Sequence, residues 1–180
     1  MTVRFPFPRF VKRRFVREAG GSVAVEFALT AIPFFVLLFA IFEAGMVFFA
    51  TSTLEQALHE AARTIRTGQA QTAGRTVQQM KSDICSEVAL LSDCASKLQL
   101  DVRVFSQFSG VTTPPVTDGN GKIDTKKLAF NMGSAGDIVL IRAFYIWNIM
   151  SPFSTGLSNN GAGTRLLQSS VAFRNEPFTS

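Results

Sequence analysis

The chain has 180 residues, of which 47% are hydrophobic and 17% charged, and its formal net charge is +5. This length leaves room for one modest domain beside a membrane segment. The excess positive charge lies entirely in residues 1–20, whose charged residues are Arg4, Arg9, Lys12, Arg13, Arg14, Arg17 and Glu18. A nucleic-acid-binding domain would spread basic charge over a folded face. We therefore expect no nucleic-acid partner.

A long apolar stretch follows this basic segment. No residue from Phe27 to Phe42 is charged, and Ala44 to Ala50 continues the apolar run. About 20 apolar residues suffice to cross the hydrocarbon core, whereas the apolar region of a cleaved secretory signal has about 7–15. The sequence predicts a basic cytoplasmic leader at residues 1–21 and a transmembrane helix at 22–50. The positive charge before the helix predicts a cytoplasmic N-terminus.

Three residues inside the predicted span need an explanation. Pro33 removes one backbone hydrogen bond, so it either kinks the helix or is a tolerated membrane proline. Glu43 lies about one span length from Ser22, which predicts a charge in the outer headgroup region. Glu26 lies near the cytoplasmic start, where a buried carboxylate needs a partner. Glu26 either has a functional partner, or it simply extends to the cytoplasmic membrane interface or pairs with Arg17.

Helical periodicity continues through residues 51–67 as an amphipathic extension. Its apolar residues repeat every three or four positions on one face and are Leu54, Leu58, Ala61 and Ile65. Arg63 and Arg66 suit the end of a helix, and Gly68 is a plausible stop. One continuous helix from about Val23 to Thr67 would be roughly 65 Å long. The apolar face is expected to pack on the domain that follows, and a partner helix is the alternative.

Residues 68–180 are predicted to form a periplasmic α+β domain. Val77, Met80, Ile84 and Val88 are spaced as on a helix, which predicts a helix over Thr76–Val88. Strands are predicted from Leu98 to Val104, where apolar residues alternate with Gln99, Asp101 and Arg103, over the apolar Asp137–Trp147, and over Leu166–Phe173. The long Thr112–Lys127 segment reads as a loop. The fold class is therefore α+β, with a long N-terminal helix and a short antiparallel sheet.

Two groups of residues in this region raise the question of a disulfide or a metal site. Cys85 and Cys94 are expected to form a disulfide outside the cytoplasm, which would contribute roughly 2–3 kcal/mol. Two unpaired thiols or a partial metal site are the alternatives, but the single histidine, His59, is remote in sequence. Asp118, Asn120 and Asp124 resemble part of a calcium loop that lacks its final glutamate. We expect no metal and no other cofactor.

The junction between leader and apolar helix resembles a type IV prepilin processing site. It reads Gly21-Ser22-Val23-Ala24-Val25-Glu26-Phe27. The resemblance implies that a prepilin peptidase cuts between Gly21 and Ser22, which makes Glu26 the fifth residue of the mature chain. Glu26 of one subunit could then accept the new α-ammonium group of its neighbour, with Phe27 beside it, and so set the register of assembly.

The match is closer to the TadE-like pseudopilins of tight-adherence (Flp) pilus systems. The shared elements are Glu26-Phe27, Pro33, Glu43-Ala44-Gly45, Glu55-Gln56-Ala57 and Ala61-Ala62-Arg63, and they cover about Gly20 to Gly68. The closing Arg174-Asn175-Glu176-Pro177-Phe178 also resembles a tail seen in this family. Residues 69–165 add nothing to the resemblance.

The resemblance implies a non-catalytic minor pseudopilin of the bacterial inner membrane that supports pilus biogenesis. Its expected partners are the prepilin peptidase, pilin or other pseudopilins, and the inner-membrane pilus platform, with no small-molecule substrate. The alternative is a generic membrane-tethered periplasmic interaction domain that is not cut after Gly21. The sequence shows no phosphate loop or nucleophile motif, so we expect no enzyme.

Overall fold

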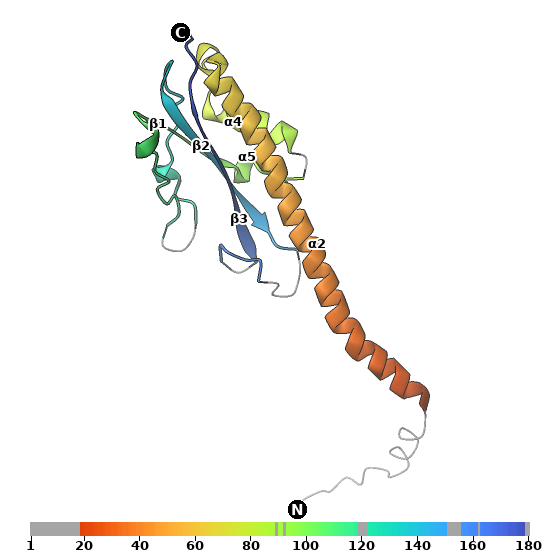
Figure 1. Ribbon diagram of the computed structural model, residues 1–180. Coiled ribbons are helices and arrows are strands. Elements are labelled where there is room, and N and C mark those ends of the chain that lie inside the picture. The colour runs from red at the N-terminus through yellow and green to blue at the C-terminus, as the bar shows by residue number, and fades with distance from the viewer. Residues whose placement is uncertain are drawn as a thin grey trace, which may run out of the picture. The chain divides into compact units, whose positions relative to one another are not determined.

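The structure is a computed structural model, and it describes residues 19–88, 90–91, 93–118, 122–150, 156–161 and 163–178. The predicted leader lies outside the described residues except for its last three. The chain divides into an N-terminal unit, residues 1–41, and a C-terminal unit, residues 42–180. The helix α2 (Ala19–Arg66) contributes to both units. The fold is α+β, as predicted (Figure 1).

The end of α2 follows from local chemistry. Arg63 and Arg66 occupy its last turn, where positive charge interacts favourably with the helix dipole. Gly68 then takes φ +78°, a left-handed conformation that glycine adopts without steric cost, and its N–H donates to the Ile65 carbonyl. The predicted stop at Gly68 is confirmed. The short helix α3 (Gln69–Thr72) follows directly.

The second long helix, α4 (Val77–Glu87), lies where the periodicity predicted it. Thr76 caps its N-terminus through a reciprocal pair of hydrogen bonds with Gln79. Met80, Ile84 and Val88 are buried. Cys85, in the last turns of α4, is bonded to Cys94 at the start of the short helix α5 (Cys94–Lys97), which confirms the predicted disulfide.

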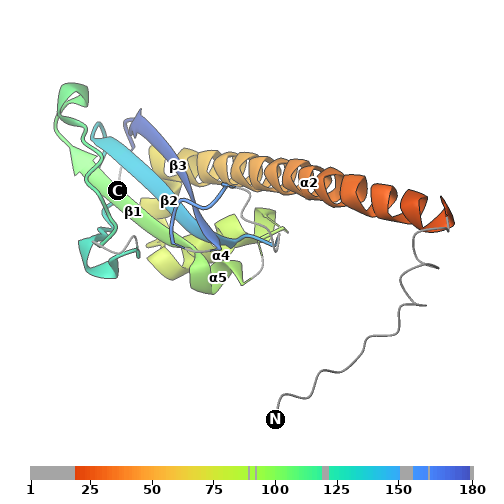
Figure 2. The ribbon, with the colours of Figure 1, turned by 90° about the horizontal axis from the view of Figure 1, so that it is seen from below.

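The sheet contains β1 (Gln99–Phe105), β2 (Ile138–Asn148) and β3 (Thr164–Arg174), in the order β1-β2-β3 (Figures 1 and 2). Both pairings are antiparallel, as predicted. The apolar β2 is the central strand. The long connection between β1 and β2 contains the 3-10 turns η1 (Phe108–Gly110) and η2 (Thr125–Lys127).

The two faces of the sheet have different coverings. The main core joins one face to the second half of α2 and to α4 and α5, and it includes the predicted helical stripe of Leu54, Leu58, Ala61 and Ile65. The opposite face carries a smaller cluster of Val116, Ile123 and Phe144, supplied partly by the β1–β2 connection. The sheet is therefore buried on both faces over part of its area.

The C-terminal residues pass over the end of α2. The Glu176 N–H donates to the Arg66 carbonyl at 2.8 Å, and the Arg66 Nε atom lies 3.3 Å from Glu176 Oε1. The Asn175 side chain, which is buried, donates to the carbonyls of Met132 and Ser134. A Cβ atom added at Gly68 would lie 2.3 Å from the Phe178 ring. The tail thus covers the C-terminal end of α2.

Gly68→Ala should therefore destabilise the C-terminal unit more than Gly74→Ala does. Both glycines have positive φ, at +78° and +58°, but the space around Gly74 is open. Left-handed backbone costs a non-glycine residue about 1–3 kcal/mol, and at Gly68 the Phe178 ring must also move. Urea unfolding of the full chain in detergent micelles measures both losses. Equal losses would contradict the Phe178 contact.

Candidate assembly interface

The N-terminal unit has no core of its own among its described residues. From Gly21 to Thr30 every residue is exposed, and most of the large apolar side chains from there through Ile41 are exposed as well. This part of α2 is long and apolar enough to cross a membrane, and none of its most apolar 18-residue stretch is buried within the protein. Such a surface is stable only in lipid or against other apolar helices.

The predicted processing and register residues lie together at the start of this surface. Gly21, Ser22, Glu26 and Phe27 are helical and exposed. The Ser22 hydroxyl lies 3.4 Å from Glu26 Oε1, one helical turn away. A cut after Gly21 would place Glu26 about one helical turn from the new N-terminus.

Pro33 lies inside α2, which continues through it without interruption. Proline has no N–H, so the Leu29 carbonyl lacks its usual helical donor. Nearby, the Thr30 hydroxyl donates to the carbonyls of Glu26 and Phe27. The helix therefore tolerates Pro33 without a break, as membrane helices do.

Glu43, predicted as a charge in the outer headgroup region, is held by the C-terminal unit. Its side chain is buried, with 3% of the residue exposed. Trp147 Nε1 donates to Glu43 Oε1 at 3.2 Å, and the Met150 N–H donates to Oε2 at 3.1 Å. Trp147 belongs to the end of β2 and Met150 follows that strand. The carboxylate therefore joins α2 to the end of the central strand.

A buried ion pair on the other face of the sheet was missed by the sequence reading. Asp101 was expected among the polar, outward residues of its strand, yet it is fully buried. It faces Arg142 directly across β1 and β2, with Arg142 Nη2 2.7 Å and Nε 3.1 Å from Asp101 Oδ2. A lone arginine within the apolar β2 segment was the available signal, because a buried charge requires a partner.

The same carboxylate holds the β1–β2 connection. Arg103 Nε and the Ala129 N–H also donate to Asp101, at 2.9 Å and 2.8 Å, and Arg142 Nη1 donates to the Pro114 carbonyl. Burial alone would raise the pKa of Asp101. The hydrogen bonds from Arg103, Ala129 and Arg142 and the charge of Arg142 outweigh it and lower the pKa below its ordinary value.

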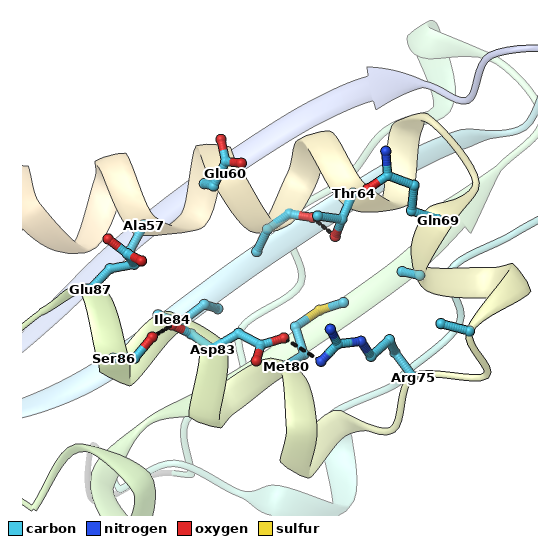
Figure 3. A pocket seen from close by; sticks show the side chains of 13 residues that line it. Ala57, Glu60, Thr64, Gln69, Arg75, Met80, Asp83, Ile84, Ser86 and Glu87 are labelled. Carbon is cyan, nitrogen blue, oxygen red and sulfur yellow. Dashed lines mark hydrogen bonds and ion pairs between the residues drawn. The ribbon is translucent and has the colours of Figure 1, made fainter.

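A groove of about 510 Å³ lies between α2 and α4 (Figure 3). Small side chains, including Ala57 and Ala61, leave this space where the two helices meet. Of its carboxylates, Asp83 pairs with Arg75 at 2.7 Å and Glu60 pairs with Arg63. These charged groups therefore form ion pairs along the rim of the groove.

Potential metal ligands do not gather in the described part of the chain. There, no three His, Cys, Asp or Glu side chains are close enough to hold an ion. In the segment that resembled a calcium loop, Asp118 accepts from the Lys122 N–H and Asp124 accepts from the Lys126 N–H. Asn120 lies outside the described residues. These two carboxylates thus stabilise backbone turns by accepting hydrogen bonds from nearby N–H groups.

Comparison with known families bears on nearly the whole of α2. The family model described as TadE-like protein matches residues 21–63. The chain is similar to this family over that segment. No curated protein and no solved structure is significantly similar to the chain. The match agrees with the family resemblance predicted from the residues.

The TadE-like segment contains most of the features described on α2. It begins at Gly21, the predicted cutting position, and includes Glu26, Pro33 and Glu43. It ends at residue 63, near the end of the stripe that packs on the sheet. The sheet, the Asp101–Arg142 pair and the disulfide lie outside it. The TadE-like segment is therefore nearly all of one long helix, which is exposed in its first half and packs on the sheet in its second half.

Proposed function

We propose that the protein is a membrane-anchored, TadE-like pilus-assembly protein, a minor pseudopilin that acts through helix packing. The observation that carries the proposal is the coincidence of the TadE-like match over residues 21–63 with a helix whose large apolar side chains are exposed in its first half. The N-terminus lies in the cytoplasm and the C-terminal unit in the periplasm, because the basic residues precede the helix.

Processing prepares this helix for assembly. A prepilin peptidase cuts after Gly21, which removes all the basic residues of the leader and leaves a new α-ammonium group on Ser22. Removing these charges lowers the electrostatic barrier to moving the helix out of the membrane. The exposed apolar side chains then supply contact area with pilin, other pseudopilins or the platform.

Glu26 sets the register of that contact. It accepts the Ser22 ammonium group of a neighbouring subunit within an apolar bundle. Opposite charges attract strongly in a low-dielectric setting, and the pair is favourable only where geometry and hydrogen bonds offset desolvation. Because Glu26 is exposed in the single chain, it is available to such a neighbour.

The N-terminal sequence of the protein recovered from membranes, with and without the prepilin peptidase, tests processing. We expect a start at Ser22 only when the peptidase is present. Glu26→Gln should be cut normally yet lose most pilus assembly, because a neutral amide binds an ammonium group more weakly. Glu55→Gln, an exposed carboxylate change on the same helix, is the matched control and should assemble normally.

An intact N-terminus in both strains would refute the pseudopilin mechanism. It would leave the alternative function, a tethered periplasmic domain that is not processed. Normal assembly by Glu26→Gln, with cutting after Gly21 intact, would instead remove only the register role of Glu26.

A further inference from the structure

The first turns of α2 in the C-terminal unit have two opposite faces. Glu43, Val47 and Ala50 point into the unit and are buried. Phe42, Phe48 and Phe49 lie on the rest of the helix surface, and 61%, 74% and 57% of these residues is exposed. A helix that is buried on one side and carries exposed phenylalanines elsewhere requires a second apolar environment.

Met150 extends this surface from α2 to the sheet. It follows β2, is 61% exposed, and its N–H donates to the Glu43 carboxylate. We call Phe42, Phe48, Phe49 and Met150 the apolar base. Within the described part of the C-terminal unit, the other large exposed apolar side chain is Phe108. It follows the end of β1 where Phe105 pairs with Ile138, the opposite end of β2 from Trp147.

Along the chain, Phe42, Phe48 and Phe49 of the apolar base follow the apolar segment of the N-terminal unit. On the outward side of α2 the apolar base gives way to the hydroxyl residues Thr51, Ser52 and Thr53 and then to the exposed Glu55 and Gln56. The apolar stretch from Val23 to Phe49 is about 40 Å long as a helix, whereas the hydrocarbon core is about 30 Å thick. Its last turns therefore extend into the outer interfacial layer when its first turns begin at the inner one.

We propose that the apolar base seats the C-terminal unit in the outer surface of the lipid bilayer, with the Glu43–Trp147 hydrogen bond at the depth of the headgroups. The proposal rests on the proposed membrane anchoring. Interfacial segments bury their apolar face about 5–10 Å into the boundary between headgroups and acyl chains. The unit itself shields Glu43 from lipid, which allows a carboxylate to occupy this depth.

Trp147 is the single tryptophan of the chain and therefore reports on this contact directly. The full chain is reconstituted in phosphatidylcholine vesicles in which part of the lipid is brominated near the headgroup. Bromine quenches tryptophan only at short range. We expect Trp147 fluorescence to fall about twofold, because shallow immersion brings the indole near the brominated layer.

Exposed residues provide matched variants that should leave the fold intact. Phe48→Ser combined with Phe49→Ser should recover most of the Trp147 fluorescence, while the apolar segment before Phe42 still holds the protein in the vesicles. Phe108→Ser removes an equally exposed ring from the other end of the sheet and should be quenched like the unaltered protein.

Two results would overturn the lipid contact. One is Trp147 fluorescence that brominated lipid does not change; the other is quenching unaffected by the Phe48 and Phe49 changes. Efficient disulfide cross-linking of Phe49→Cys between copies, together with absent quenching, would assign the base to a second copy. Loss of anchoring itself would be seen separately, as failure of the protein to float with the vesicles.

Discussion

Replacing Asp101 by Asn is expected to lower the free energy of unfolding of the C-terminal unit by about 3–5 kcal/mol, because it leaves the buried Arg142 cation without its counter-charge. Arg142 is 2% exposed and donates twice to Asp101. The same carboxylate accepts from Arg103 and Ala129. Urea unfolding of the full chain in detergent micelles, followed by Trp147 fluorescence, measures the loss.

Two controls separate the buried charge from other effects of the substitution. Asp83→Asn removes a carboxylate whose pair with Arg75 is exposed, and it should cost less than about 1 kcal/mol. Replacing Asp101 by Leu and Arg142 by Met together should restore part of the stability, since well-packed apolar residues often equal a buried ion pair. The rest stays lost because Arg103 and the Ala129 N–H no longer have this acceptor. A loss from Asp101→Asn as small as that from Asp83→Asn would refute the role assigned to the pair.

The lowered pKa of Asp101 also predicts an acid-dependent stability. A carboxyl whose pKa is lower in the folded state binds fewer protons there than in the unfolded chain. Its stabilisation is complete above the unfolded pKa of about 3.9 and is lost as pH falls through the folded value. Stability of the unaltered protein should therefore decline more steeply below pH ~4 than that of Asp101→Asn.

Glu43→Ala is the change with the second largest expected effect, about 3 kcal/mol. It leaves the Trp147 indole N–H and the Met150 backbone N–H without their acceptor, and hydrogen bonds to a charged group contribute about 1.5–3 kcal/mol each. Glu43→Gln retains one oxygen acceptor and should lose about half as much. Circular dichroism during urea unfolding is the suitable measurement, because the environment of Trp147 itself changes.

Glu55→Ala is the matched control for Glu43→Ala. Glu55 lies on the same helix, but its side chain is 60% exposed and lies 4.0 Å from His59. An exposed pair of this kind contributes less than about 1 kcal/mol. If both alanine substitutions gave the same loss, the hydrogen bonds of Glu43 between α2 and the end of β2 would add no stability.

Local patterns predicted the elements of this protein because short-range physics defines them. The spacing of Leu54, Leu58 and Ile65 predicted the packed stripe of α2, and those residues are buried. Gly68 predicted the helix end, and the pairing of Cys85 with Cys94 followed from their compartment and spacing. The apolar β2 segment predicted a strand. The alternation of apolar and polar residues from Leu98 to Val104 predicted a half-buried neighbouring strand in an antiparallel sheet.

The sequence by itself thus determined the apolar helix, the TadE-like segment and the α+β class, because helix periodicity, chain length and charge asymmetry are properties of neighbouring residues. Only the tertiary structure decided where Glu43 and Asp101 lie. Their partners are remote in sequence, Trp147 for Glu43 and Arg142 for Asp101. A charged residue looks solvent-exposed in any local pattern, and it becomes buried only when a distant segment supplies its hydrogen bonds and counter-charge.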